Sequence, residues 1–400
     1  MLKQLLTFTL SSLLSFTVSA NNTIIPKGNG AWVYDETYNA QGTRINPKAG
    51  LFVDALKQYN AGASDEHKIN QIFSYGGNLE MYCSGSGESN LTTQCGPNQF
   101  LILFYPPQNI SKKNNDWDYY MRNIGDSGYA SLEQYKDVDQ SNHVITIDGR
   151  VDNTKLGIYD YLDHFNTLSK TDAAHFADKV AKNICANNDI DGVQFDIEPF
   201  SFTGKGGTYA GSGQKYFYSQ LAKDFAGYYA NPNDPAGINP DISTDPLHCI
   251  NAKHPNGRFF STFTFSQYVT PEVIEAFKHH NNGMVVDSLY DLSNTPGGTL
   301  TSVSEFSKLV SNELQAIKSK GIAYQLAIPA AASAHEFGGI HQIDYVKTAI
   351  GLINQAGIRN DENFKGIAVW GWTQQMWWNG IKLTPASPDT ATIKYLQNHL

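Results

Sequence analysis

Short apolar runs alternate with longer helical patterns along this chain from residue 30 to its end. The apolar runs are rich in β-branched and aromatic residues, as strands are, whereas the segments between them repeat apolar residues at helical spacing. In the segment 171–186, for example, Phe176, Val180 and Ile184 recur every four residues after a threonine that can cap a helix. Strands are predicted at 31–34, 69–75, 143–148, 192–198, 259–266, 284–290, 323–328 and 366–372.

Eight strands alternating with helices predict a single α/β domain, a (β/α)8 TIM barrel. Because the signals of the first and third strands are weak, an open doubly wound sheet is the alternative. The seventh and eighth strands are too close in sequence for a large insertion subdomain between them, which predicts an open cleft and endo-type cutting. Helices are predicted at 171–186, 214–226, 271–278, 303–319 and 344–356.

The fourth predicted strand carries an unusual polar face. Alternation along a strand places Gln194, Asp196 and Glu198 on one side and apolar residues on the other. Polar groups on a buried strand are costly unless they bond one another or form a site. They lie near the carboxyl end of the strand, where β/α barrels hold their active sites, and two carboxylates this close shift each other's pKa values. The pattern favours acid/base catalysis over the alternatives, which are a buried salt bridge or a helix cap.

The composition narrows the class of partner. The net charge is −9 without a basic cluster, which disfavours nucleic acid, because phosphate binding needs a concentrated Lys/Arg surface. The 22 Tyr, 21 Phe and 6 Trp suit the apolar faces of sugars better. No zinc-type spacing and no His-Glu-x-x-His segment occurs, so we expect no metal and no cofactor. We further expect a monomer.

The first residues have the pattern of a secretory signal peptide. Lys3 supplies positive charge, an apolar run spans 5–18, and Val18-Ser19-Ala20 is a small-x-small cleavage site. We therefore expect residues 1–20 to be removed after Ala20 and residues 21–400 to form the barrel in a secreted or periplasmic protein. No other stretch is apolar for long enough to span a membrane.

The chain has 4 cysteines, an even number that favours disulfides in an exported protein. Cys83 and Cys95 flank a Gly/Ser/Thr-rich loop and are the expected local pair. Cys185 and Cys249 then form the second pair. The other two connectivities and free thiols remain open.

The fourth-strand segment resembles the signature of glycoside hydrolase family 18, which includes chitinases and endo-β-N-acetylglucosaminidases. The family pattern Asp-x-x-Asp-x-Asp-x-Glu corresponds here to Asp191, Gln194, Asp196 and Glu198, with Gly192 inside it. Tyr290-Asp291 is similar to the family motif that ends the sixth strand, and Trp370 to the eighth-strand tryptophan below the sugar. The resemblance covers most of the chain after residue 20.

The resemblance implies hydrolysis of β-1,4 linkages in glycans that contain N-acetylglucosamine, by a substrate-assisted retaining mechanism. Glu198 would be the general acid and base. Asp196 would bind the acetamide N–H of the substrate, and Tyr290 would bind its oxygen. Gln194, Asp291, Trp370 and Tyr34 would contact the substrate, although a tryptophan at position 370 could also be plain core.

Two positions depart from the family motifs. Ser288 stands where Met is usual in the sixth-strand motif. Gln194 stands where a carboxylate is usual, and its amide can donate a hydrogen bond to Asp196 but cannot share a proton. A non-hydrolytic, lectin-like barrel is therefore an alternative, although the retained Glu198 favours an enzyme. A two-carboxylate retaining glycosidase is less favoured, because Leu326-Ala327-Ile328-Pro329 ends the seventh strand without a carboxylate.

Overall fold

The computed structural model describes the larger part of the 400-residue chain. The described residues are 24–33, 37–38, 44–45, 50–81, 100–103, 138–149, 170–197, 213–227, 247–289, 292, 302–330, 342–370, 376–378, 381–383 and 388–400.

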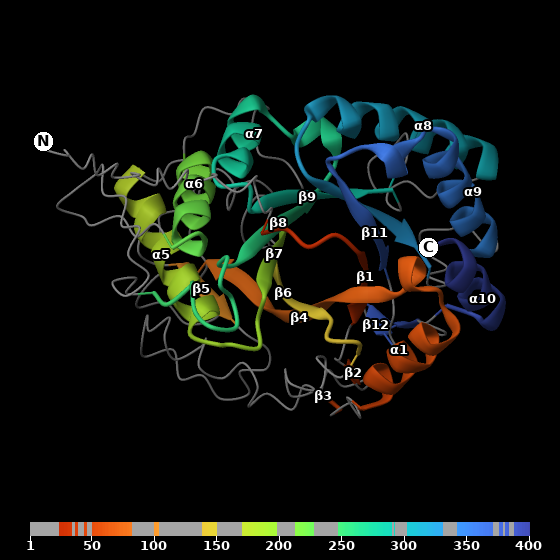
Figure 1. Cartoon of the computed structure of the whole chain (residues 1–400), viewed down its shortest axis with the longest axis horizontal. Helices are drawn as coiled ribbons and strands as arrows, with labels where there is room; N and C mark the ends of the chain where they lie inside the picture. The colour runs from red at the N-terminus through yellow and green to blue at the C-terminus, as the bar shows by residue number, and fades with distance from the viewer. Residues whose placement is uncertain are drawn as a thin grey trace, which may run out of the picture.

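Eight strands of a nine-stranded sheet close into a parallel barrel at the centre of the protein (Figure 1). The strand order is β1-β11-β10-β9-β8-β7-β6-β4-β5, and the pairing of β1 with β4 closes the ring. The predicted (β/α)8 barrel is confirmed, and the doubly wound alternative is excluded by this closure. The barrel strands are β1 (Asn29–Val33), β4 (Ile69–Met81), β6 (Asn142–Gly149), β7 (Gly192–Ile197), β8 (Phe259–Thr264), β9 (Gly283–Ser288), β10 (Tyr324–Pro329) and β11 (Phe364–Trp370).

Helices surround the barrel on its outer side (Figure 1). Five of them were predicted from sequence and begin and end within two residues of the expected positions. Of all the helices described, none is both long and apolar enough to cross a bilayer. The five are α5 (Lys170–Cys185), α6 (Gly213–Phe225), α7 (Pro271–Lys278), α8 (Val303–Lys320) and α9 (Gln342–Gln355).

Two of the described helices were not predicted, α1 (Gly50–Gly62) and α10 (Thr390–His399), and they pack against each other. The N-cap of α10 is Asp389, whose Oδ1 accepts a hydrogen bond from the Thr392 N–H at 2.7 Å. Between β10 and β11 the described residues form α9 and the short 3₁₀ turn η4 (Ile358–Asn360). As predicted, this stretch is too short for a large insertion subdomain.

Helix α8 shows how local sequence determines where a helix begins and ends and which face it buries. It begins after Ser302, whose Oγ accepts from the Glu305 N–H at 3.1 Å, and ends at Gly321 in the left-handed region (φ 61°). Its buried residues recur every three or four positions, which makes one apolar stripe toward the barrel. These residues are Phe306, Val310, Leu314 and Ile317.

Two apolar clusters divide the core. The larger cluster fills the layer between the strands and the helices, and the smaller one fills the barrel interior. Since both faces of every barrel strand are covered, successive residues of one strand contribute to different clusters. The interior cluster consists of Ile25, Trp32, Phe73, Val144, Phe259, Phe263, Met284, Val286, Ala327, Ala368 and Trp370.

Strand β4 runs six residues beyond its predicted end at Tyr75. Its last residues pair antiparallel with β5 (Phe100–Leu103), which adds a strand outside the barrel. Two small antiparallel pairs are also present in the described residues. They are β2 (Thr37–Tyr38) with β3 (Arg44–Ile45) and β12 (Met376–Trp378) with β13 (Ile381–Leu383). The 3₁₀ turns η1 (Asp65–His67) and η3 (Ser266–Tyr268) lie before β4 and before α7.

Candidate functional site

The polar face predicted on the fourth barrel strand, β7, is present at Gln194. Val193 and Phe195 belong to the outer cluster, and the Phe195 ring packs edge-on against Phe217 of α6 at a centroid distance of 5.4 Å. Gln194 lies on the opposite, interior side and is 0% exposed. A fully buried amide is stable only where its carbonyl and amino groups find partners.

The carbonyl oxygen of Gln194 has two donors from other strands. Trp32 Nε1 of β1 donates to Gln194 Oε1 at 2.7 Å, and Thr146 Oγ1 of β6 donates to the same oxygen at 3.3 Å. Thr146 is the register partner of Gln194 on the neighbouring strand. Both lone pairs of the carbonyl are therefore used.

The amide nitrogen of Gln194 has no such partner. Within the described part of the chain, Gln194 Nε2 is buried and meets no hydrogen-bond acceptor. Ser261, the register partner of Gln194 on β8, is also 0% exposed, and its Oγ is buried without a partner in the same part of the chain. Two adjacent strands thus present polar groups inside the barrel that described residues leave unsatisfied.

Aromatic rings line the interior beside this amide. The Trp32 indole stacks on Phe73 at a centroid distance of 4.7 Å and an interplanar angle of 23°. Phe263 meets the same indole edge-on at 5.7 Å. Trp370, which was predicted to stack on a sugar ring, belongs to the same interior cluster and is 8% exposed.

Several predicted site residues lie outside the described residues: Glu198, Tyr290, Asp291, Tyr34, Cys83 and Cys95. The backbone of Asp196 is described within β7, where its Cα pairs in register with Asp148 of β6. β7 ends one residue later, at Ile197, so Asp196 occupies the carboxyl-terminal part of the strand.

Asp191 and Gly192 of the motif lie at the other end of β7 and have structural roles. Asp191 Oδ2 accepts from the backbone N–H of His143 at 2.7 Å, and its Oδ1 lies 3.0 Å from His254 Nε2. A Cβ on Gly192 would lie 2.7 Å from the carbonyl oxygen of Phe259, closer than real Cβ atoms approach. The motif therefore combines packing residues at the amino end of the strand with polar residues at its carboxyl end.

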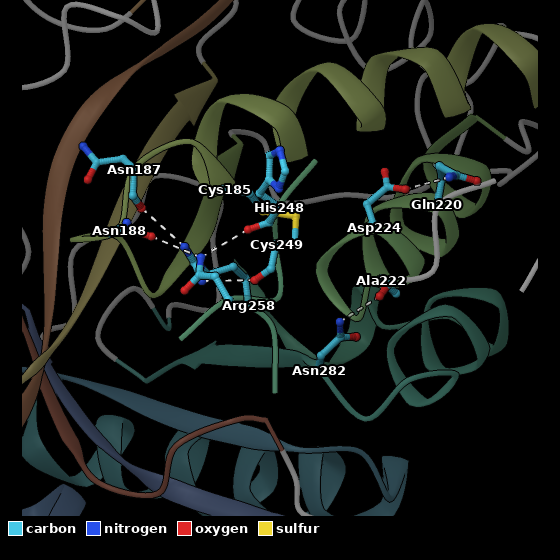
Figure 2. The surroundings of a disulfide bond; sticks show 11 residues. Cys185, Asn187, Asn188, Gln220, Ala222, Asp224, His248, Cys249, Arg258 and Asn282 are labelled. Carbon is cyan, nitrogen blue, oxygen red and sulfur yellow. Dashed lines mark hydrogen bonds between the residues drawn. A yellow bond between two sulfur atoms is a disulfide. The ribbon is translucent and has the colours of Figure 1, made fainter. Parts of the chain in front are cut away.

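The predicted Cys185–Cys249 disulfide is present and joins the end of α5 to the segment before β8 (Figure 2). Both cysteines are buried, at 2% and 0% exposure. Arg258, also fully buried, donates to the backbone carbonyls of Cys249 at 3.2 Å and Asn187 at 3.4 Å. Burial lowers the pKa of Arg258 to about 10, and the negative charge of Asp191 opposes this shift.

A buried carboxyl group that the sequence analysis did not single out lies on the outer side of β9. Asp287 is 0% exposed, and its pKa is raised well above the ordinary value, first by burial and then by the nearby charge of Glu313 from α8. Glu313 Oε1 in turn accepts from the backbone N–H of Ser266 at 2.6 Å. In the described residues, no group of three His, Cys, Asp or Glu side chains is placed to hold a metal ion.

Sequence reasoning missed Trp32, Thr146 and Ser261. A signal for Trp32 was present, because it lies two residues before Tyr34 and so on the same face of the first strand. A buried indole N–H needs a hydrogen-bond acceptor, and in a closed barrel the interior positions of the other strands can supply one.

The sequence matches no protein-family model and no curated protein. Solved structures similar to this one include the endo-β-1,4-glucanase Xac0029 from Xanthomonas axonopodis pv. citri, at 7% identity and a TM-score of 0.48, over 93% of this chain and 98% of that one. A tamarind chitinase-like lectin is similar at 10% identity and a TM-score of 0.37, over 86% and 94% of the two chains.

A GH138 enzyme targeting pectin rhamnogalacturonan II is similar at 10% identity and a TM-score of 0.41, over 93% of this chain. This chain spans only 39% of the length of that enzyme. Likeness at these levels assigns neither a family nor an activity.

Proposed function

We propose that this protein is a glycoside hydrolase that cleaves β-1,4 linkages in glycans containing N-acetylglucosamine. One observation carries the proposal: a fully buried amide, Gln194, is held inside the closed barrel two residues before Asp196 on the same strand. The active site would lie at the carboxyl ends of the strands, as in β/α barrels generally.

Extending the alternation of Val193, Gln194 and Phe195 along the rest of the strand would place Asp196 and Glu198 on the interior face that begins with Gln194. Their catalytic roles are those that the resemblance to glycoside hydrolase family 18 implies. Glu198 would protonate the glycosidic oxygen while the acetamido carbonyl of the substrate attacks the anomeric carbon. The same residue would afterwards take a proton from the attacking water.

Asp196 would accept a hydrogen bond from the acetamide N–H and stabilise the positive charge of the cyclic intermediate. Tyr290 would donate to the acetamide oxygen, and Asp291 and Tyr34 would bind the sugar near it. Trp370 contributes an aromatic ring to the barrel interior, and a sugar ring would stack on the exposed part of that ring.

Gln194 gives this site a donor that does not titrate. Its Nε2 is buried and lacks an acceptor in the described chain, so it is available to the carboxylate of Asp196. Such a bond would hold Asp196 as an anion, and the catalytic cycle would proceed without a proton shared between positions 194 and 196. We expect slower turnover than a carboxylate pair would give.

A non-hydrolytic sugar-binding barrel is the second candidate. The observation that favours it is the same amide, since a neutral side chain whose orientation is fixed by Trp32 and Thr146 suits binding as well as catalysis. The third candidate, a two-carboxylate glycosidase, lacks a nucleophile on β10, whose sequence Tyr324–Pro329 contains no carboxylate.

Hydrolysis of a fluorogenic chito-oligosaccharide by the wild type and by Glu198→Gln tests the proposal. Loss of a general acid should lower kcat by about 10²- to 10⁴-fold with little change in KM. Glu275→Gln makes the same chemical change on the exposed face of α7 and should leave kcat unaltered. Turnover that survives Glu198→Gln removes Glu198 from its role. Tight binding of the oligosaccharide without turnover in the wild type favours the lectin.

Export is part of the same proposal. We propose that residues 1–20 are cleaved after Ala20, that residues 21–400 form one secreted or periplasmic, monomeric domain, and that Cys83 pairs with Cys95. N-terminal sequencing and the mass of the protein purified from the culture medium or periplasm test cleavage and thiol pairing, and size-exclusion chromatography tests the monomeric state. A mass that includes residues 1–20 or two free thiols contradicts the corresponding part.

A further inference from the structure

The hydrogen bond between Trp32 and Gln194 determines which way the Gln194 amide faces. An indole nitrogen only donates, so the atom of Gln194 at 2.7 Å must be the carbonyl oxygen. With the amide turned over, two donors would face each other in a site where Trp32 is 3% and Gln194 0% exposed. The Thr146 hydroxyl can donate or accept, and by itself would tolerate either orientation.

The indole is in turn held by its neighbours. Phe73 stacks on one face of the ring, and Phe263 packs edge-on against it. Buried rings packed on two sides have few alternative rotamers, so the direction of the Nε1–H bond is fixed. The orientation of the Gln194 amide is therefore fixed by a residue of β1, Trp32.

With its carbonyl oxygen bound to Trp32, Gln194 has its amide nitrogen available as a donor. Gln194 Nε2 carries two hydrogens, is buried, and meets no acceptor in the described part of the structure. A buried donor left without an acceptor is costly, so the folded protein favours an acceptor beside it. Asp196, two residues on along β7, is the nearest carboxylate in the sequence.

We propose that Trp32 is a positioning residue: by binding Gln194 Oε1, it makes Gln194 a permanent donor toward the carboxylate of Asp196. This inference rests on the proposed function for its catalytic consequence, but the orientation of the amide can be tested without it. Trp32 does not touch the substrate in this scheme and acts only through Gln194.

A double-mutant cycle separates this role from simple packing. Trp32→Phe keeps a ring in the cluster and removes the donor, whereas Gln194→Met keeps the shape of the side chain and removes the amide. Trp32→Phe should lower kcat about tenfold, the equivalent of one buried hydrogen bond, with KM within about twofold. In the Gln194→Met background, Trp32→Phe should cause no further loss. An equal loss in both backgrounds overturns the positioning role.

A second measurement does not depend on activity. In ¹⁵N-labelled protein, the Trp32 indole N–H should exchange with solvent at least about tenfold more slowly in the wild type than in Gln194→Met. Equal exchange in the two proteins overturns the inference even if both are folded. A wild type that hydrolyses no chito-oligosaccharide overturns the proposed function instead, and the exchange experiment then decides the orientation by itself.

Discussion

Trp32 Nε1 and Gln194 Oε1 are 162 positions apart in the chain and form a buried hydrogen bond of 2.7 Å across the barrel interior. The bond connects the first and fourth barrel strands, which do not pair with each other in the sheet. The bond satisfies the indole donor and the amide acceptor together. It joins β1, whose pairing with β4 closes the barrel, to the polar face of β7.

The stability that this bond provides can be measured directly. Trp32→Phe should lower the free energy of unfolding by about 1–3 kcal/mol, because it removes one hydrogen bond and the part of the ring by which indole exceeds phenyl. Trp32→Ala should cost about 3–5 kcal/mol, because it also leaves a cavity in the interior cluster. Urea unfolding at constant pH measures both values. If Trp32→Phe is as stable as the wild type, the hydrogen bond makes no separate contribution.

Asp287→Asn should change how stability depends on pH. Burial and the charge of Glu313 raise the pKa of Asp287 above its ordinary 3.8 in the folded protein. Folding therefore favours the protonated form of Asp287. The contribution of this group to the free energy of unfolding is complete below pH 3.8 and is lost as the pH rises through its pKa in the folded protein. At neutral pH the wild type must keep this carboxyl protonated or bury its charge, and either costs free energy of folding.

Asn cannot ionise, so Asp287→Asn should be more stable than the wild type at neutral pH and should show a weaker decline between about pH 4 and pH 8. Urea midpoints across that range test the expectation. Glu275→Gln, on an exposed side chain, serves as the control and should follow the wild-type curve. Parallel curves for Asp287→Asn and the wild type would contradict the raised pKa.

Removing the Cys185–Cys249 disulfide should destabilise the protein strongly. The bond closes a loop with a sequence separation of 64, for which the chain-entropy model gives about 4 kcal/mol. The double variant Cys185→Ala/Cys249→Ala should therefore unfold at a markedly lower temperature, measured by calorimetry without reductant. Dithiothreitol should lower the Tm of the wild type toward that of the variant. No change in Tm on reduction or substitution would show that packing alone holds this segment.

Gly192→Ala should destabilise the barrel although it adds one methyl group. The new Cβ would meet the Phe259 carbonyl oxygen at 2.7 Å and the Phe259 ring at 3.0 Å, which requires a backbone shift costing about 1–3 kcal/mol. Gly351→Ala is the matched control, because that glycine lies inside α9 with nothing within 4 Å. It should stabilise by about 0.5–1 kcal/mol through helix propensity. Chemical denaturation of both variants gives the comparison, and stabilisation at position 192 would contradict the close packing.

Local sequence determined the order and type of the barrel elements. Apolar, β-branched runs and helical repeats are short-range signals, so all eight barrel strands and five helices were predicted close to their observed positions. The same alternation assigned Val193 and Phe195 to one face of β7 and Gln194 to the other. Helices α1 and α10 and the antiparallel β5 were missed, since they are fixed mainly by what they pack against or pair with.

Only the tertiary structure decided which distant residues meet. In a barrel both faces of a strand are buried, so alternation cannot tell an interior polar residue such as Gln194 from an outward buried one such as Asp287. The partners of Gln194 depend on closure of the ring and on the register of neighbouring strands, which sequence spacing does not encode. The folded barrel brought Trp32 and Thr146 to one amide, and it gave Asp191 its partners His143 and His254.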